Sequence, residues 1–105
     1  MKTLHDLVAD KLERSDAPTR QALLRVPLDN IGRWLANGHT APHRFEQWRR
    51  LILRAQQSED GFQELLRLLR DHDEAATHLK SFDPFPGALT TLERRQYLQE
   101  CAYAH

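Results

Sequence analysis

Apolar residues recur at every third or fourth position along most of the chain, and no segment alternates apolar and polar residues with a period of two. This spacing is typical of amphipathic helices that pack through one face. We therefore expect an all-α protein, a compact single-domain bundle of about five to seven helices over residues 1–105. No apolar run is long enough to cross a membrane.

The first helix is expected to begin after Thr3, and the second after Ser15 or Asp16, because these residue types cap helix N-termini. Pro18 fits the first turn of the second helix. Pro27 is expected to end that helix, since a proline biases the preceding residue away from helical angles. The expected buried residues of both helices are Leu4, Leu7, Val8, Leu12, Ala22, Leu23 and Val26.

A third helix is expected over residues 28–37, with Gly38 as a left-handed stop. Thr40 is expected to cap a fourth helix over residues 41–57, with Pro42 in its first turn. The apolar residues that define the inner faces of these two helices are Leu28, Ile31, Leu35, Phe45, Trp48, Ile52 and Ala55.

The remainder of the chain predicts three more helices. Ser58 is expected to cap a fifth helix, and a short helix follows the polar segment Asp71–Glu74. The segment Phe82–Gly87 predicts an ordered loop whose two phenylalanines enter the core, because two prolines and a glycine exclude helix. Thr90–Glu93 has the spacing of a capping box and opens the last helix. The apolar residues of these helices are Phe62, Leu65, Leu66, Leu69, Ala75, Ala76, Leu79, Leu92, Tyr97, Leu98 and Cys101.

Charge is balanced over the whole chain but unevenly distributed along it. The formal net charge is +0, yet residues 14–56 hold eight arginines against three acids, and residues 57–105 hold five bases against nine acids. Arginine makes planar, bidentate contacts with phosphate, carboxylate or guanine. The central arginines therefore indicate either an acidic partner or solvated helix faces.

Two features of the sequence favour a cytoplasmic protein. Cys101 is the only cysteine, so the chain cannot form an internal disulfide. The first sixteen residues carry acids and no apolar core of the kind that a secretory signal requires.

The predicted third helix has the composition of a helix that contacts DNA bases. With its apolar residues inside, Asn30, Arg33 and Asn37 are expected to face outward, where arginine pairs with guanine and asparagine with adenine. Other polar residues around this helix are expected to contact phosphates. These residues are Arg20, Arg25, His39, Thr40, Arg44 and Arg49.

The same region resembles a known family. Ile31 to Pro42, with the pattern Ile-x-Arg-Trp-Leu-x-x-Gly-x-x-x-Pro, is similar to the end of a phage-repressor-type helix-turn-helix, and the resemblance covers residues 20–52. It implies a helix-turn-helix-like central part, a recognition helix that ends near Gly38, and double-stranded DNA as partner. Gln21 and Arg25 stand where that family usually has a small residue and a turn glycine.

A second resemblance lies in residues 78–95, His-Leu-Lys-Ser-Phe-Asp-Pro-Phe-Pro-Gly-Ala-Leu-Thr-Thr-Leu-Glu-Arg-Arg. This segment is similar to the closing box of small bacterial helical proteins from toxin–antitoxin neighbourhoods. It implies an antitoxin-like or regulatory role, with a partner protein beside the DNA.

Other chemistry finds little support in the sequence. His39 and His43 flank a helix start rather than share a face, and structural zinc usually needs four nitrogen or sulfur ligands. No catalytic motif stands out, so we expect neither an enzyme nor a cofactor or metal.

The leading hypothesis is a homodimeric DNA-binding regulator. The alternative is a helical protein–protein interaction module that binds no nucleic acid, because DNA-binding proteins usually carry net positive charge.

Overall fold

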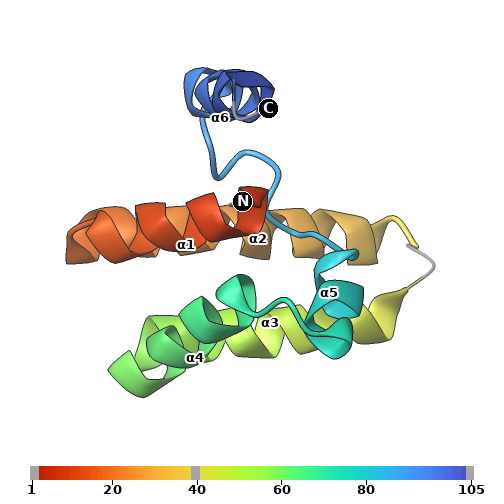
Figure 1. Ribbon diagram of the computed structural model, residues 1–105. Helices are drawn as coiled ribbons and strands as arrows, with labels where there is room; N and C mark the ends of the chain where they lie inside the picture. The colour runs from red at the N-terminus through yellow and green to blue at the C-terminus, as the bar shows by residue number, and fades with distance from the viewer. Residues whose placement is uncertain (1–2, 39–40, 104–105) are drawn as a thin grey trace.

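The computed structural model describes residues 3–38 and 41–103, with residues 100–103 described in their backbone alone. Within this part of the chain, all regular structure is helical, and the all-α single domain predicted above is confirmed. Four helices surround one core, in which α1 lies beside α2 and α4, and α3 lies beside α2 and α4 (Figure 1). The helices are α1 (Leu4–Arg14), α2 (Ala17–Ala36), α3 (Pro42–Gln57), α4 (Glu59–Arg70), α5 (Glu74–Lys80) and α6 (Thr91–Tyr103).

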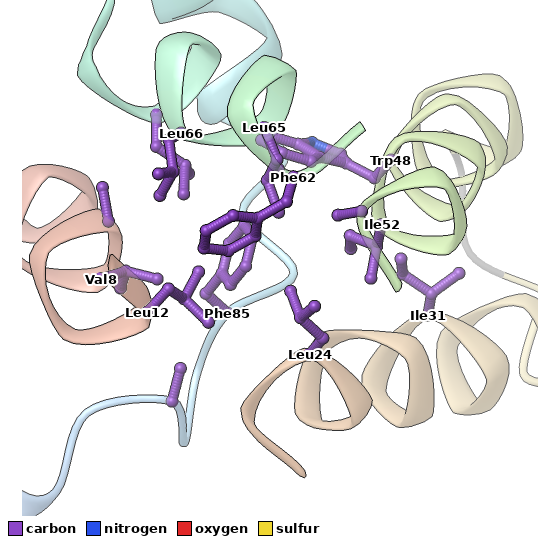
Figure 2. Close-up of a cluster of buried hydrophobic side chains, with 14 of the residues drawn as sticks. Val8, Leu12, Leu24, Ile31, Trp48, Ile52, Phe62, Leu65, Leu66 and Phe85 are labelled. Atoms are coloured by element: carbon purple, nitrogen blue, oxygen red, sulfur yellow. The ribbon is translucent and has the colours of Figure 1, made fainter. Parts of the chain in front are cut away.

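The core lies between these four helices and is closed by the loop that precedes α6. Figure 2 shows side chains from all four helices pointing toward one another, with Phe85 of the loop among them. Trp48 is fully buried, and its indole Nε1 donates a hydrogen bond to the Leu79 carbonyl at 3.1 Å. The Phe85 ring meets the Trp48 ring edge-on, with ring centroids 5.4 Å apart. Phe85 therefore enters the core as predicted.

Most helix ends lie where the local sequence places them. Thr3 caps α1, Asp16 caps α2 and Ser58 caps α4, each through its side-chain oxygen. These three predicted caps are confirmed, as is the left-handed Gly38 after α2, with a φ of 73°. Thr40, the predicted cap of α3, lies outside the described residues.

One predicted helix boundary is wrong. Pro27 does not end a helix but lies inside α2, which runs without interruption over 20 residues. A proline within a helix removes one backbone hydrogen bond and costs about 3 kcal/mol. Here the proline ring is fully buried, so its burial offsets part of that cost. The predicted second and third helices are consequently one element, and no turn separates residues 20–26 from residues 28–36.

This continuity changes which residues of α2 face the core. Leu24 is fully buried together with Ile31. Ala22, expected inside, is exposed, and Val26 is only partly buried. The reason is that a helix without a break carries one helical phase through Pro27, whereas two helices could each choose their own.

The loop between α5 and α6 is ordered by a tight turn. Phe85 to Ala88 has proline at its second position and glycine at its third, which is the composition of a type II turn. The φ of Gly87 is 95°, and the Ala88 amide donates to the Phe85 carbonyl at 2.9 Å. The turn directs the chain away from the core toward α6.

Helix α6 stands apart from the four-helix body (Figure 1). Its predicted capping box is present, since the Thr90 amide donates to Glu93 at 2.8 Å and the Glu93 amide donates to Thr90 Oγ1 at 3.1 Å. The Lys11 ammonium of α1 contacts Glu93 Oε1 at 2.7 Å and the Ala88 carbonyl at 2.9 Å. The first turn of α6 is thus attached to α1. Leu92 in this first turn and Leu98 farther along α6 are exposed by 62% and 56%.

Candidate interaction surface

Asn30, expected to contact DNA bases, is instead engaged inside the protein. It is 5% exposed, and its side-chain Nδ2 donates to the carbonyls of Pro84 and Pro86, both at 2.9 Å. Its Oδ1 accepts a hydrogen bond from the Arg33 guanidinium. Both sides of the amide are therefore occupied, and the expectation that Asn30 faces outward is wrong. Its place in the fold is to hold the loop against α2.

The other two predicted base-contacting residues do lie on the surface. Arg33 is exposed on the outer side of α2, on the same helical stripe as Arg25 and Asp29. Asn37 is exposed at the C-terminal end of α2, where its backbone amide donates to the Arg33 carbonyl at 3.0 Å.

The predicted phosphate-contacting residues do not form one surface. The Arg20 guanidinium lies over the Phe62 ring, 3.7 Å from its centroid, and 3.6 Å from a Glu59 oxygen. Arg20 is therefore engaged within the chain, where burial of its partner ring strengthens the cation–π contact. His39 and Thr40 lie outside the described residues.

Arg44 and Arg49 extend from α3. Arg44 lines a hollow of about 340 Å³. Asp71, at the end of α4, and Asp73, before the start of α5, line the same hollow. Arg49 is exposed, with its guanidinium 3.7 Å from a Glu46 oxygen. Among the arginines predicted to contact bases or phosphates, only Arg25 and Arg33 lie on the outer stripe of α2.

Two hollows meet at the turn that Asn30 holds. The larger has a volume of about 880 Å³ and lies along the outer side of α2, with Pro86 and Gly87 as its opposite wall. The smaller has a volume of about 220 Å³ and lies between α1, the same two residues and the start of α6. Pro86 and Gly87 thus line both hollows. The α2 residues that line the larger hollow are Val26, Leu28, Asp29, Asn30, Gly32, Arg33 and Ala36.

The smaller hollow combines apolar walls with charge. Arg94 of α6 lines it, as do Leu4 and Leu89. Within it, His5 Nε2 lies 3.2 Å from Asp83 Oδ1. We call the two hollows, the Arg25 stripe of α2 and helix α6 together the α2–α6 surface.

Basic side chains on the α2–α6 surface lack acidic partners. None of Arg25, Arg33, Arg94 and Arg95 forms an ion pair with a described residue. Asp29 likewise has no such partner. The four guanidinium groups are matched in number by four acids of this surface, which are Asp29, the His5-paired Asp83, and Glu93 and Glu100 of α6.

Glu93, at the base of α6, is held in its charged form. Partial burial acts to raise its pKa, but hydrogen bonds from Lys11 and Thr90 outweigh burial, so the pKa of Glu93 lies below its usual value. The attachment of α6 to α1 therefore depends on an ionised carboxylate.

Two kinds of feature are absent from the described residues. No three His, Cys, Asp or Glu side chains among them gather closely enough to hold a metal ion. None of the helices in that part of the chain combines the length and apolar character needed to cross a bilayer.

Comparisons with protein-family models, with curated proteins and with solved structures find no significant match to this chain.

Proposed function

We propose that this protein is a helical protein–protein interaction module and that α6 is its main docking element. The observation that carries the proposal is the exposure of Leu92 and Leu98, the only large apolar side chains that are exposed among those described. A helix of 13 residues is marginal in water by itself, and the Lys11–Glu93 contact attaches the first turn of α6 to α1. A partner that covers the leucines would supply the packing that α6 lacks.

Site-specific cross-linking tests this proposal directly. A photoreactive amino acid replaces Leu92 or Leu98 in the full chain, expressed in its own cells, and a matched control places it at Ala75, which is exposed on α5. We expect adducts of discrete mass from both α6 positions and none from the control. A lack of adducts at both leucines, or equal adducts from Ala75, would contradict the proposal.

A DNA-binding regulator is the second candidate, and one observation favours it. Arg25 and Arg33 project from one stripe of α2, and neither forms an ion pair with a described carboxylate. Both guanidinium groups could therefore pair with phosphates or with guanine. Against it stand the uninterrupted α2, which lacks the turn of a helix-turn-helix, and the internal engagement of Asn30.

A binding titration with random duplex DNA at two salt concentrations separates the two candidates. Phosphate contacts make affinity fall steeply as salt rises. DNA binding with that salt dependence, lost in Arg33→Ala, would favour the regulator. No binding even at low salt leaves the interaction module as the function.

A further inference from the structure

The two asparagines of the chain lie in opposite surroundings. Asn30 is 5% exposed, its side-chain amide donates to two carbonyls of the loop, and Ile31 follows it in the sequence. Asn37 is exposed at the C-terminal end of α2, and the residue that follows it, Gly38, is exposed as well. An exposed asparagine followed by glycine has a chemistry that a buried asparagine followed by isoleucine lacks.

We propose that Asn37–Gly38 is a site of spontaneous deamidation, which makes it a modification site at the end of α2. The backbone nitrogen of Gly38, on losing its proton, attacks Cγ of the Asn37 side chain. A cyclic succinimide forms as the Cγ–Nδ2 bond breaks, and Nδ2 takes up a proton and leaves as ammonia. One water then opens the ring at either of its two carbonyls, which gives aspartate or isoaspartate. Asparagine is accordingly among the thermolabile residues.

The attacking nitrogen of Gly38 is sterically accessible. A side chain on the residue after an asparagine crowds this nitrogen and restricts the backbone, whereas glycine does neither. A Cβ added to Gly38 would meet no atom within 4 Å, so neighbouring segments do not cover this position either. The Asn37 side chain can therefore approach the nitrogen from an open side.

The attack also requires a rotation of the Asn37 backbone. Its ψ is 8°, and Cγ reaches the Gly38 nitrogen only after rotation about this bond. The Gly38 amide donates to the Leu35 carbonyl at 3.2 Å, and this hydrogen bond must open first. The bonds from the Asn37 amide to the Arg33 and Leu35 carbonyls can remain, because ψ lies beyond that amide. Helix ends open locally at a low free energy, so this rotation does not require the core to unfold.

A second pair in the sequence, Asp60–Gly61, shows what a closed site looks like, since aspartate before glycine can form the same succinimide. Gly61 lies in the first turn of α4, and its amide donates to Ser58 Oγ at 3.0 Å. A Cβ at Gly61 would lie 2.2 Å from the Arg54 carbonyl oxygen. Rotation there would break both the helix cap and the contact between α3 and α4. Asn37–Gly38 instead combines the reactive pair with a helix end.

The modification changes the charge at the end of α2 and is independent of the function proposed above. Either product carries a carboxylate where Asn37 is neutral, which lowers the formal net charge of the chain by one from +0. A negative charge at a helix C-terminus is unfavourable, because the helix dipole places partial negative charge there. Isoaspartate also lengthens the backbone path. We expect the last turn of α2 to loosen, while the core remains unchanged.

Incubation of the full folded chain, followed by proteolysis and mass spectrometry, tests the inference. Samples are held at neutral and at mildly alkaline pH, either folded or unfolded in urea. Fragmentation that separates aspartate from isoaspartate identifies the products, and digestion in heavy-oxygen water marks deamidation that occurs during handling. Asn30 is the internal control in each sample. Asn37→Gln is the matched variant, because a glutamine must close a larger ring.

In the folded chain, we expect Asn37 to deamidate at least about tenfold faster than Asn30, and faster at alkaline than at neutral pH. Isoaspartate should accompany aspartate, because the succinimide opens at both carbonyls. Folding should slow the reaction at Asn37 by less than about a hundredfold, since local opening of the helix end suffices. A reaction that needed global unfolding would be slowed by at least about a thousandfold. Asn37→Gln should give no product at this position.

Three results would overturn the inference. Slowing at Asn37 by more than about a hundredfold on folding would show that the Gly38–Leu35 hydrogen bond closes the site. Aspartate without isoaspartate would show that no succinimide forms. Equal deamidation of Asn30 and Asn37 in the folded chain would show that the surroundings of the two asparagines do not control the reaction.

Discussion

The four-helix body and the α2–α6 surface differ in how they pack their leucines. In the body, leucine side chains are buried or partly buried. Its arginines vary: Arg20, Arg54 and Arg70 each have a carboxylate or an aromatic ring as neighbour, whereas Arg14, Arg50 and Arg67 form no ion pair with a described residue. On the α2–α6 surface, Leu92 and Leu98 are exposed and Arg33 has only the Asn30 amide. The two exposed leucines are therefore the place where a second molecule would add apolar packing.

The glycines of the two regions show the same contrast, and their substitution should have the largest effect. A Cβ at Gly61 in the body would lie 2.2 Å from the Arg54 carbonyl oxygen. The backbones of α3 and α4 can therefore lie this close only because Gly61 has no side chain. Gly61→Ala should lower the free energy of unfolding by about 3 kcal/mol, because the backbones must separate. Urea denaturation followed by circular dichroism measures the loss.

Gly32→Ala is the matched control for that experiment. Gly32 also lies within a helix, but a Cβ there would meet nothing within 4 Å. Replacing a helical glycine by alanine should raise the free energy of unfolding by about 0.5–1 kcal/mol. Equal destabilisation by the two substitutions would contradict the distinction between a closely packed body and an open outer face of α2.

Asn30 joins α2 to the loop that leads from the body to α6. Asn30→Ala removes both donors to the Pro84 and Pro86 carbonyls, and these carbonyls would lose their partner next to the core. We expect a loss of about 2 kcal/mol in the free energy of unfolding, with shifted amide signals for Phe85 and Gly87. Thermal unfolding and NMR spectra measure the two effects.

Asn37→Ala provides the control, since Asn37 is exposed at the end of α2. Its side chain should contribute less than about 0.5 kcal/mol to folding. If Asn37→Ala lost as much stability as Asn30→Ala, the loop would not be held by the Asn30 amide.

The smallest expected effect is the response of α6 to pH. The pKa of Glu93 lies below its usual value, so its stabilising contact with Lys11 is complete above the unfolded value of about 4.3. That contribution is lost as the pH falls through the lower folded pKa. Because the pair is partly exposed, we expect a change of only about 0.5–1 kcal/mol.

Amide signals of residues 90–98, followed from pH 7 to pH 3 by NMR, measure this change. Lys11→Met should remove most of the α6 response below pH about 4.3, because the charged partner of Glu93 is gone. The body also loses charge contacts in this range, since the hydrogen bond from Arg70 lowers the pKa of Glu13. An α6 response unchanged in Lys11→Met would show that another contact attaches the helix.

Sequence alone determined the features that depend on neighbours three or four residues apart. Helix caps such as Thr3 and Ser58, the glycine stop at Gly38 and the buried stripe of α3 all arise within one or two turns. Their interactions are local, so the pattern of residue types was sufficient to predict them. The all-α class of the fold follows from the same local spacing of apolar and polar residues.

Only the tertiary structure decided the role of residues whose partners are distant in sequence. Asn30 binds the Pro84 carbonyl across 54 residues, and Arg20 lies over Phe62. Pro27 stays within a helix because its ring is buried by packing that no local pattern specifies. In each case a contact between distant segments outweighs a local preference, and the free energy of such a contact exists only once the chain has folded.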